Sequence, residues 1–192
     1  MGDEEQQCVF CQIASGKIPA KKVYEDDKVT AVLDINPGTS GHVLVIPKQH
    51  AAIMPQMADD LIAHLGMVAK QLSQALIRAL KVEGTSIFVA NGVAAGQRAP
   101  HFLLHVIPRT QNDEVALQPA IVKVDQKTAE AVFEKLSVSV AKQFGKEPMK
   151  PKPGKEEGKK EEPKTEKKIE RPAEKPSKSK LDEITNFLTG GK

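Results

Sequence analysis

Two histidines near the middle of the chain, His101 and His105, are four residues apart, a spacing that places both side chains on one face of a β-strand. Leu103 lies between them on the same face, whereas Phe102 and Leu104 point to the opposite face. Near neutral pH an imidazole can act as a base, a proton donor or a metal ligand. The pattern predicts a strand with one face toward the protein core and the other toward a functional site.

Two cysteines form a second group of residues that could take part in chemistry. Cys8 and Cys11 have Cys-x-x-Cys spacing; 38 residues separate Cys11 from His50, and 50 separate His50 from His101. Two thiolates and two imidazoles can complete the tetrahedral shell of a structural zinc ion. The spacing alone also fits, and slightly favours, two cysteines that pack near the N-terminus beside unrelated histidines, so both interpretations stay open here.

Short β-branched runs and two long amphipathic stretches must position these side chains. The first two runs are separated by a turn-forming Asn-Pro-Gly cluster, and the last two by a glycine-rich loop, which predicts two antiparallel pairs. The predicted strands cover residues 29–33, 42–46, 86–90 and 102–107. Apolar stripes at helical spacing predict helices over residues 58–81 and 126–144. Together these elements predict an α+β domain with an antiparallel sheet.

Three separate blocks stand in one order within residues 8–110: CVFCQIASGKIPAKKVYEDD, AVLDINPGTSGHVLVIPKQH and AAGQRAPHFLLHVIPR. In this order and spacing they resemble the histidine triad (HIT) family, whose signature carries histidines at three alternate positions of one strand. The resemblance implies a HIT-like antiparallel sheet with one long central helix and a C-terminal helix. It also implies a homodimer.

The family's reaction depends on the central histidine of that signature. Family members bind nucleotides and hydrolyse or transfer the phosphoryl-linked group, and the central imidazole attacks the α-phosphorus. Leu103 stands at this position and has no lone pair to offer. The resemblance therefore implies a purine nucleotide-binding protein whose nucleotidyl hydrolase or transferase activity is impaired, and it leaves open whether the chain is an enzyme.

His105 is the candidate catalytic residue that remains. It can activate a water molecule as a general base, which would make the protein an active nucleotide phosphoramidase or dinucleoside polyphosphate hydrolase. A hydrogen-bonded structural role for His105 is equally compatible with the sequence.

The family's binding residues are better preserved than its nucleophile. Asp34 matches the acidic residue that accepts the ribose hydroxyls, and apolar residues match positions that sandwich the base, although ordinary core packing explains them too. Asn91 is one position away from the family's phosphate-binding asparagine, and Gly96 and Gln97 belong to a tight loop whose N–H groups can face a phosphate. Arg98 either contacts phosphate or faces solvent. The predicted nucleotide-binding residues are Phe10, Ile13, Asp34, Ile35, Asn91, Gly96 and Gln97.

The resemblance also favours the zinc interpretation. A branch of the family that includes the galactose-1-phosphate uridylyltransferases holds zinc through a Cys-x-x-Cys pair, an upstream histidine and the first triad histidine. The matching ligands of a structural Zn²⁺ are Cys8, Cys11, His50 and His101.

Charge and composition divide the chain. Residues 1–145 carry 14 Lys and Arg against 15 Asp and Glu, whereas residues 146–180 carry 13 against 8. We therefore predict a histidine-triad-like domain over residues 1–145 and a disordered Lys/Glu/Pro-rich linker over residues 146–180. The interleaved glutamates weaken any field toward phosphates, which makes nucleic acid an unfavoured partner.

Residues 181–192 end the chain with apolar side chains at helical spacing, in a segment too short to form a stable helix alone. The segment is either a frayed terminus or a short amphipathic docking peptide, and in the latter case the protein could act as an adaptor. An acidic start without a signal peptide and the lack of a membrane-spanning run predict a cytoplasmic protein.

Overall fold

The computed structural model describes residues 7–117 and 121–150, in two compact units that lie within Met1–Ala120 and Ile121–Lys192. The single domain predicted over residues 1–145 stays a prediction. Most of the predicted linker, beyond residue 150, and the predicted docking segment over residues 181–192 lie outside the described residues. In the described part no helix is both long and apolar enough to cross a membrane.

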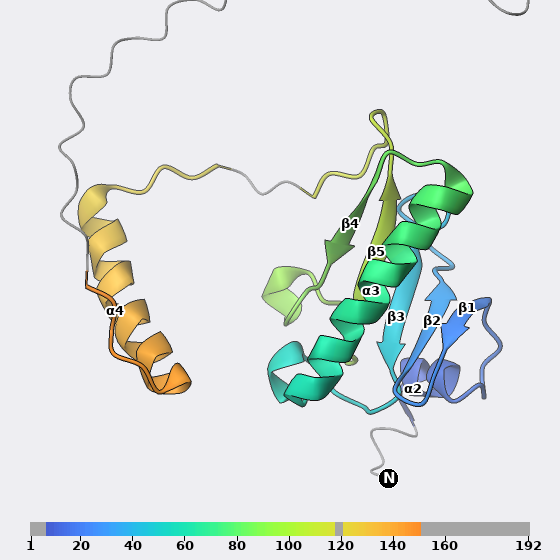
Figure 1. Cartoon of the computed structure of the whole chain (residues 1–192), viewed down its shortest axis with the longest axis horizontal. Helices are drawn as coiled ribbons and strands as arrows, with labels where there is room; N and C mark the ends of the chain where they lie inside the picture. Colours follow the sequence, from blue (N-terminus) through green and yellow to red (C-terminus); the bar gives the residue numbers. More distant parts are fainter. Residues whose placement is uncertain (1–6, 118–120, 151–192) are drawn as a thin grey trace, which may run out of the picture. The chain divides into compact units, whose positions relative to one another are not determined.

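The first unit is built on a five-stranded antiparallel sheet in the order β1-β2-β3-β5-β4 (Figure 1). The long helix α3, Asp59–Leu80, runs across one face of this sheet (Figure 1). A short helix α2, Val9–Ala14, precedes the sheet, and two short 3₁₀ turns, Met54–Gln56 and Val93–Ala95, lie in the connections. The strands are β1 Lys22–Glu25, β2 Val29–Leu33, β3 Val43–Pro47, β4 Gly84–Phe88 and β5 Leu104–Arg109.

Alternate residues of the central strands enter two different apolar clusters, one on each face of the sheet. The first cluster joins Val43 and Val45 of β3 to Leu61 and Leu65 of α3. The second cluster joins Leu44 and Ile46 of β3 to Ala14 of α2, with Phe10, Ile13 and Leu103 packed against it. Because side chains alternate along a strand, α3 and α2 cover opposite faces. The site described below lies on the face of α2.

The predicted α+β architecture is confirmed. The long helix falls within one residue of its predicted bounds, with Asp59 and Asp60 in the first turn, where the helix dipole favours negative charge. Both strand pairs form as expected, although β4 lies two residues earlier than predicted. The sequence patterns missed β1 and α2, since elements of four and six residues are too short to show a clear periodicity.

One predicted strand begins later than expected. β5 starts at Leu104, so His101 and Leu103 precede it instead of lying within it. The segment pairs elsewhere, since the N–H of Phe102 donates to the carbonyl of Ala51 at 2.7 Å. The predicted alternation of faces nevertheless holds, because Phe102 and Leu104 belong to the first cluster and Leu103 packs against the second.

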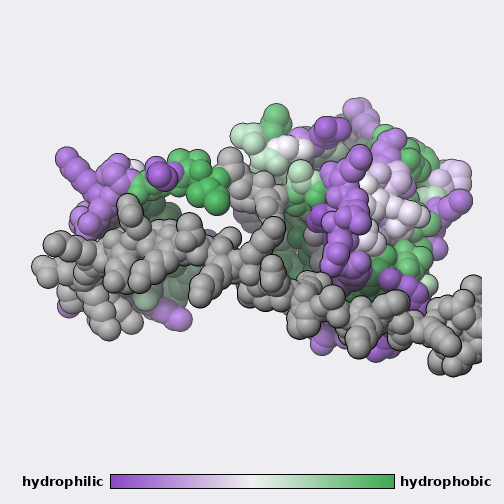
Figure 2. Space-filling view, turned by 90° about the horizontal axis from the view of Figure 1, so that it is seen from above, coloured by the Kyte–Doolittle hydropathy of each residue, from purple (hydrophilic) through white to green (hydrophobic). Residues whose placement is uncertain are grey.

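The second unit contains α4, Gln126–Phe144, with the bounds that the sequence predicts. Asp125 caps its start by accepting the Thr128 N–H at 2.9 Å, and Gly145 ends it in the left-handed conformation at a φ of 60°. Hydrophobic residues reach the surface of both units (Figure 2). Within its own unit, α4 leaves the apolar side chains of Leu136 and Phe144 exposed.

Candidate functional site

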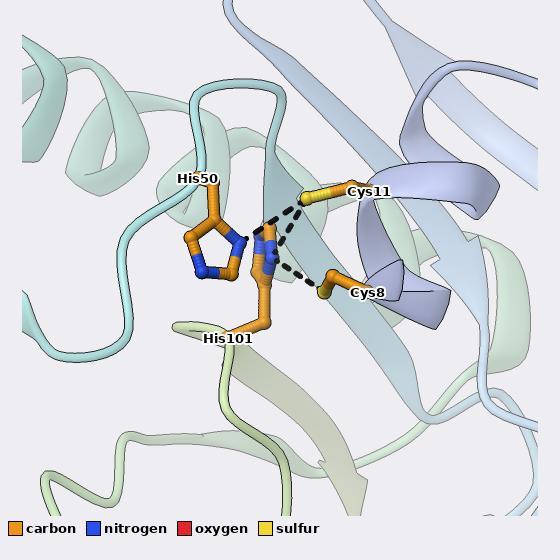
Figure 3. Close-up of side chains that lie close together, drawn as sticks. All are labelled: Cys8, Cys11, His50 and His101. Atoms are coloured by element: carbon orange, nitrogen blue, oxygen red, sulfur yellow. Dashed lines mark hydrogen bonds between the residues drawn. The ribbon is translucent and has the colours of Figure 1, made fainter. Parts of the chain in front are cut away.

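Four predicted metal ligands come together at one end of the sheet. Cys8 and Cys11 come from the start of α2, His50 from the loop after β3 and His101 from the segment before β5; Figure 3 shows the four side chains converging. Their ligand atoms all lie within 4.8 Å of one another. The cluster could therefore hold a metal ion.

The separations between ligand atoms fit a tetrahedral site. The Sγ of Cys11 lies 3.2 Å from Nδ1 of His50 and 3.5 Å from Nδ1 of His101, and the Sγ of Cys8 lies 3.4 Å from Nδ1 of His101. Zinc–sulfur bonds of about 2.3 Å and zinc–nitrogen bonds of about 2.0 Å place sulfur and nitrogen ligands roughly 3.5 Å apart in a tetrahedron. The donor set and its spacing thus suit zinc with little rearrangement.

A hydrogen bond from its second ring nitrogen orients His101 for metal binding. Nε2 lies 3.1 Å from the carbonyl oxygen of Pro47, so Nε2–H donates there and Nδ1 keeps its lone pair toward the two sulfurs. Burial lowers the pKa of His101 to about 4, which keeps the ring neutral at pH 7. A neutral imidazole oriented by a backbone carbonyl is a typical metal ligand.

A cavity of about 360 Å³ opens next to this cluster and has the size of a small-molecule site. Leu103 and His105 contribute to its wall from the segment that leads into β5 and from β5 itself. With His105 included, five of the predicted catalytic and nucleotide-binding residues line the cavity: Phe10, Asp34, Gly96, Gln97 and His105.

Three of the predicted nucleotide-binding residues do not line the cavity. Ile35 is 90% exposed, and Ile13 packs against the second apolar cluster. Asn91 lies in the loop beyond β4, where its Oδ1 accepts the N–H of Met54 at 2.9 Å, while its neighbour Ala90 lines the cavity. The nucleotide-binding role of these three residues stays a prediction.

The glycine-rich loop is held by its own hydrogen bonds. The N–H of Gly96 donates to Val93 at 2.9 Å and that of Gln97 donates to Gly92 at 3.2 Å. The Gln97 side chain accepts the Gly92 N–H at 2.6 Å and donates to the carbonyls of Ala52 and Ala99. In this conformation Gln97 braces the loop, and the two N–H groups expected to face phosphate already have acceptors.

Asp34 offers a carboxylate at the cavity wall. Its Oδ1 accepts the N–H of Asn36 at 2.9 Å, which fixes the orientation of the carboxylate. Its Oδ2 lies 3.4 Å from Nδ1 of His42, too far for a strong hydrogen bond. The carboxylate therefore keeps acceptor capacity for a ligand with paired hydroxyls.

His42 is a site residue that the sequence analysis missed. Its Nε2 lies 3.0 Å from Nδ1 of His105, and both rings line the cavity. The available signal was its position: His42 is two residues before Leu44, and Leu44 pairs directly with His105 across β3 and β5. The preceding Gly41, at a φ of 90°, makes the tight turn into β3, and a Cβ there would meet Leu80 at 2.5 Å.

The backbone sets the direction of the hydrogen bond between the two histidines. The N–H of Gly38 donates to Nδ1 of His42 at 3.2 Å, which leaves the proton of a neutral His42 on Nε2. Nε2–H then donates to Nδ1 of His105, and the proton of His105 resides on Nε2. In this tautomer His105 acts toward a ligand as a hydrogen-bond donor, and a general-base role would require the opposite proton arrangement.

The paired histidines give a pH dependence that can be measured. Burial lowers the pKa of both His42 and His105 from 6.5, and the charge of His42 lowers the pKa of His105 further. Both pKa values are therefore lower in the folded chain than in the unfolded chain. For this reason the contribution of the two histidines to the stability of the fold is fully present above about pH 6.5 and is lost as the pH falls. We expect NMR titration of the two imidazoles to give midpoints below 6.5; midpoints at or above the value of the unfolded chain would contradict this.

Comparison with known proteins agrees with this fold. The HIT domain model matches residues 15–112, and the chain belongs to the HIT family. An uncharacterized HIT-like protein of Borreliella burgdorferi is 46% identical over 108 residues, which cover 55% of this chain and 78% of the relative. The adenylylsulfatase HINT3 of Arabidopsis thaliana is 33% identical over 132 residues, which cover 67% of each chain.

Two solved structures are similar over most of the described residues. The structure of SMU.412c from Streptococcus mutans has 35% identity and a TM-score of 0.68, and covers 73% of this chain and 89% of its own. A zinc-bound histidine triad family protein from Mycobacterium smegmatis has 32% identity and a TM-score of 0.56, with 70% and 99% covered. The five-stranded antiparallel sheet with its helices is thus the HIT fold.

Proposed function

We propose that this protein binds a purine nucleotide in the cavity beside β5 and has an impaired nucleotidyl hydrolase or transferase activity. The observation that carries the proposal is the composition of the cavity wall, in which Asp34 and His105 are present and Leu103 occupies the position between His101 and His105. The adenylylsulfatase name of the Arabidopsis relative supports an adenine nucleotide as ligand.

In the proposed complex different cavity residues contact the base, the ribose and the phosphate of the nucleotide. Phe10 supplies an apolar wall for the base, and the Asp34 carboxylate accepts hydrogen bonds from the ribose hydroxyls. His105 donates a hydrogen bond to a phosphate oxygen through Nε2, in the tautomer that His42 imposes. The position of Leu103 supplies no nucleophile, since its side chain has neither a lone pair nor a proton to transfer.

We further propose that the cluster of Cys8, Cys11, His50 and His101 holds zinc in a structural role. Four protein ligands fill a tetrahedral shell and leave no open position, so the ion would stabilise the fold and take no part in the reaction. The site would fasten the start of α2 to the segment before β5. The zinc-bound relative from Mycobacterium smegmatis supports this identity.

A homodimer and a cytoplasmic location remain part of the proposal. The outer edge of β4 has no neighbouring strand in the sheet of the described unit, and its Ile87 is 55% exposed. On α3 the apolar side chains of Met67 and Ile77 are exposed as well. A sheet edge and a helix face of this kind support association of two copies.

The binding proposal is tested by replacing the ribose acceptor. Titration calorimetry with adenosine monophosphate should give saturable binding to the full chain, and Asp34→Asn should weaken it about 10- to 100-fold, since hydrogen bonds to a charged group contribute about 1.5–3 kcal/mol. Asp27→Asn removes an exposed carboxylate outside the cavity and serves as the matched control. Absent binding to the wild-type chain, or equal effects of the two variants, would refute the proposal.

A further inference from the structure

The cavity wall carries few charged side chains. Within the described residues, Asp34 is the one carboxylate that lines the cavity and Arg98 the one Lys or Arg. His42 and His105 are both neutral at pH 7, because burial lowers the pKa of each. Arg98 is therefore the fixed positive charge available to an anionic part of a ligand.

The guanidinium of Arg98 is not committed to a protein partner. Across residues 7–117 and 121–150 it takes part in no hydrogen bond or ion pair, and its side chain is exposed at the cavity wall. Arg109 offers a contrast, since it binds both carboxylate oxygens of Asp113 at 2.7 Å and also donates to Ser86 and Val115. The donors of Arg109 are thus committed to protein partners, whereas those of Arg98 are available at the cavity wall.

The backbone that carries Arg98 is held on both sides. Before it, the Gln97 side chain bridges Gly92 and Ala52; after it, the Ala99 carbonyl accepts from Nε2 of Gln97 at 2.8 Å. The Cα of Arg98 is thus placed at the cavity wall without restraint on the side chain. A guanidinium on a fixed backbone loses less freedom on binding than one on a free loop.

Other donors for a phosphate are scarce in this cavity. The N–H groups of Gly96 and Gln97 are engaged within the loop, and the side chain of Leu103 has no donor. Among the side chains that line the cavity, those that can still donate are the amide of Asn36, Nε2–H of His105 and the guanidinium of Arg98. A guanidinium is charged and can bind two phosphate oxygens at once, which makes it the strongest of these three donors.

We infer that Arg98 binds the terminal phosphate of the nucleotide and makes the cavity selective for nucleotides with a dianionic phosphate over uncharged nucleosides. The inference rests on the proposed nucleotide site and names the ligand class of that site, nucleoside mono- and diphosphates. A phosphate monoester carries close to two negative charges at pH 7.5 and pairs with a guanidinium in a bidentate manner. Arg98 is thus a specificity-determining residue.

The test compares adenosine, adenosine monophosphate and adenosine diphosphate by titration calorimetry at pH 7.5, on the full chain. We expect wild-type affinity to rise at least tenfold from adenosine to the monophosphate. Arg98→Ser should weaken binding of the two phosphates about 10- to 100-fold and change adenosine binding less than about twofold. Arg98→Lys should restore part of the loss, and Arg78→Ser, at an exposed arginine on α3 away from the cavity, should change nothing.

The outcomes separate this inference from the proposed function. Binding of adenosine and its phosphates with equal affinity, or an equal loss for all three in Arg98→Ser, overturns the role of Arg98 and leaves the nucleotide site intact. Failure of all three ligands to bind the folded wild-type chain overturns both. The melting temperature of Arg98→Ser should match wild type, which assigns its effect to binding instead of folding.

Discussion

Replacing Leu103 by histidine is expected to raise kcat/KM for an adenosine phosphoramidate by at least about 100-fold over the wild-type chain. Leu103 lines the cavity beside His105, so an imidazole introduced there has access to a bound α-phosphorus. Loss of a catalytic nucleophile typically costs several orders of magnitude in kcat, and its return should recover a measurable part. Release of adenosine monophosphate, followed by chromatography, measures the gain.

A control is needed because a polar side chain at this position can change binding as well as chemistry. Leu103 is partly buried against the second apolar cluster, and Leu103→Asn introduces polarity without a nucleophile. We expect this variant to remain as slow as wild type. Wild-type turnover at the level of Leu103→His would show that another residue, with His105 the first candidate, supports an active hydrolase.

Removing one ligand of the Cys/His cluster is expected to produce the largest change in stability. The purified full chain should contain about one zinc per molecule, and Cys11→Ser should contain almost none. A metal present at a thousand times its Kd stabilises the folded state by about 4 kcal/mol. For a domain of about 100 residues each kcal/mol shifts Tm by about 4–8 °C, so we expect a decrease of at least about 15 °C.

Chelation provides the matched control for that variant. EDTA should lower the Tm of the wild-type chain toward that of Cys11→Ser and leave the Tm of the variant unchanged, because the variant has no metal to lose. Elemental analysis before and after chelation follows the metal itself. A freshly prepared, unchelated chain that contains no metal, and a Tm insensitive to EDTA, would contradict the structural zinc site.

The elements of the fold could largely be predicted because their apolar periods are strong. Alternation of faces around Leu103 correctly separated Phe102 and Leu104 from the cavity side, even though β5 begins only at Leu104. Alternation depends on the extended backbone and not on ladder hydrogen bonds, so it survives a shift in the strand boundary. The short elements α2 and β1 span too few residues to show a period.

The site was less predictable because its members meet through tertiary structure. Cys11 and His101 are 90 residues apart, and only resemblance to a family could select His101 from five histidines. His42 was missed because its partner is chosen by the register of β3 against β5, which no local pattern encodes. The engaged N–H groups of Gly96 and Gln97 likewise follow from the folded loop and not from its glycine content.

The central claim, nucleotide binding without nucleotidyl transfer, is tested most directly by ³¹P NMR. The full-length wild-type chain is mixed with a stoichiometric amount of adenosine phosphoramidate, and the phosphorus signal is followed for several hours. We predict that the signal shifts or broadens on addition of protein and remains that of the phosphoramidate. A signal that the protein leaves unchanged, or rapid conversion to that of adenosine monophosphate, would contradict the claim.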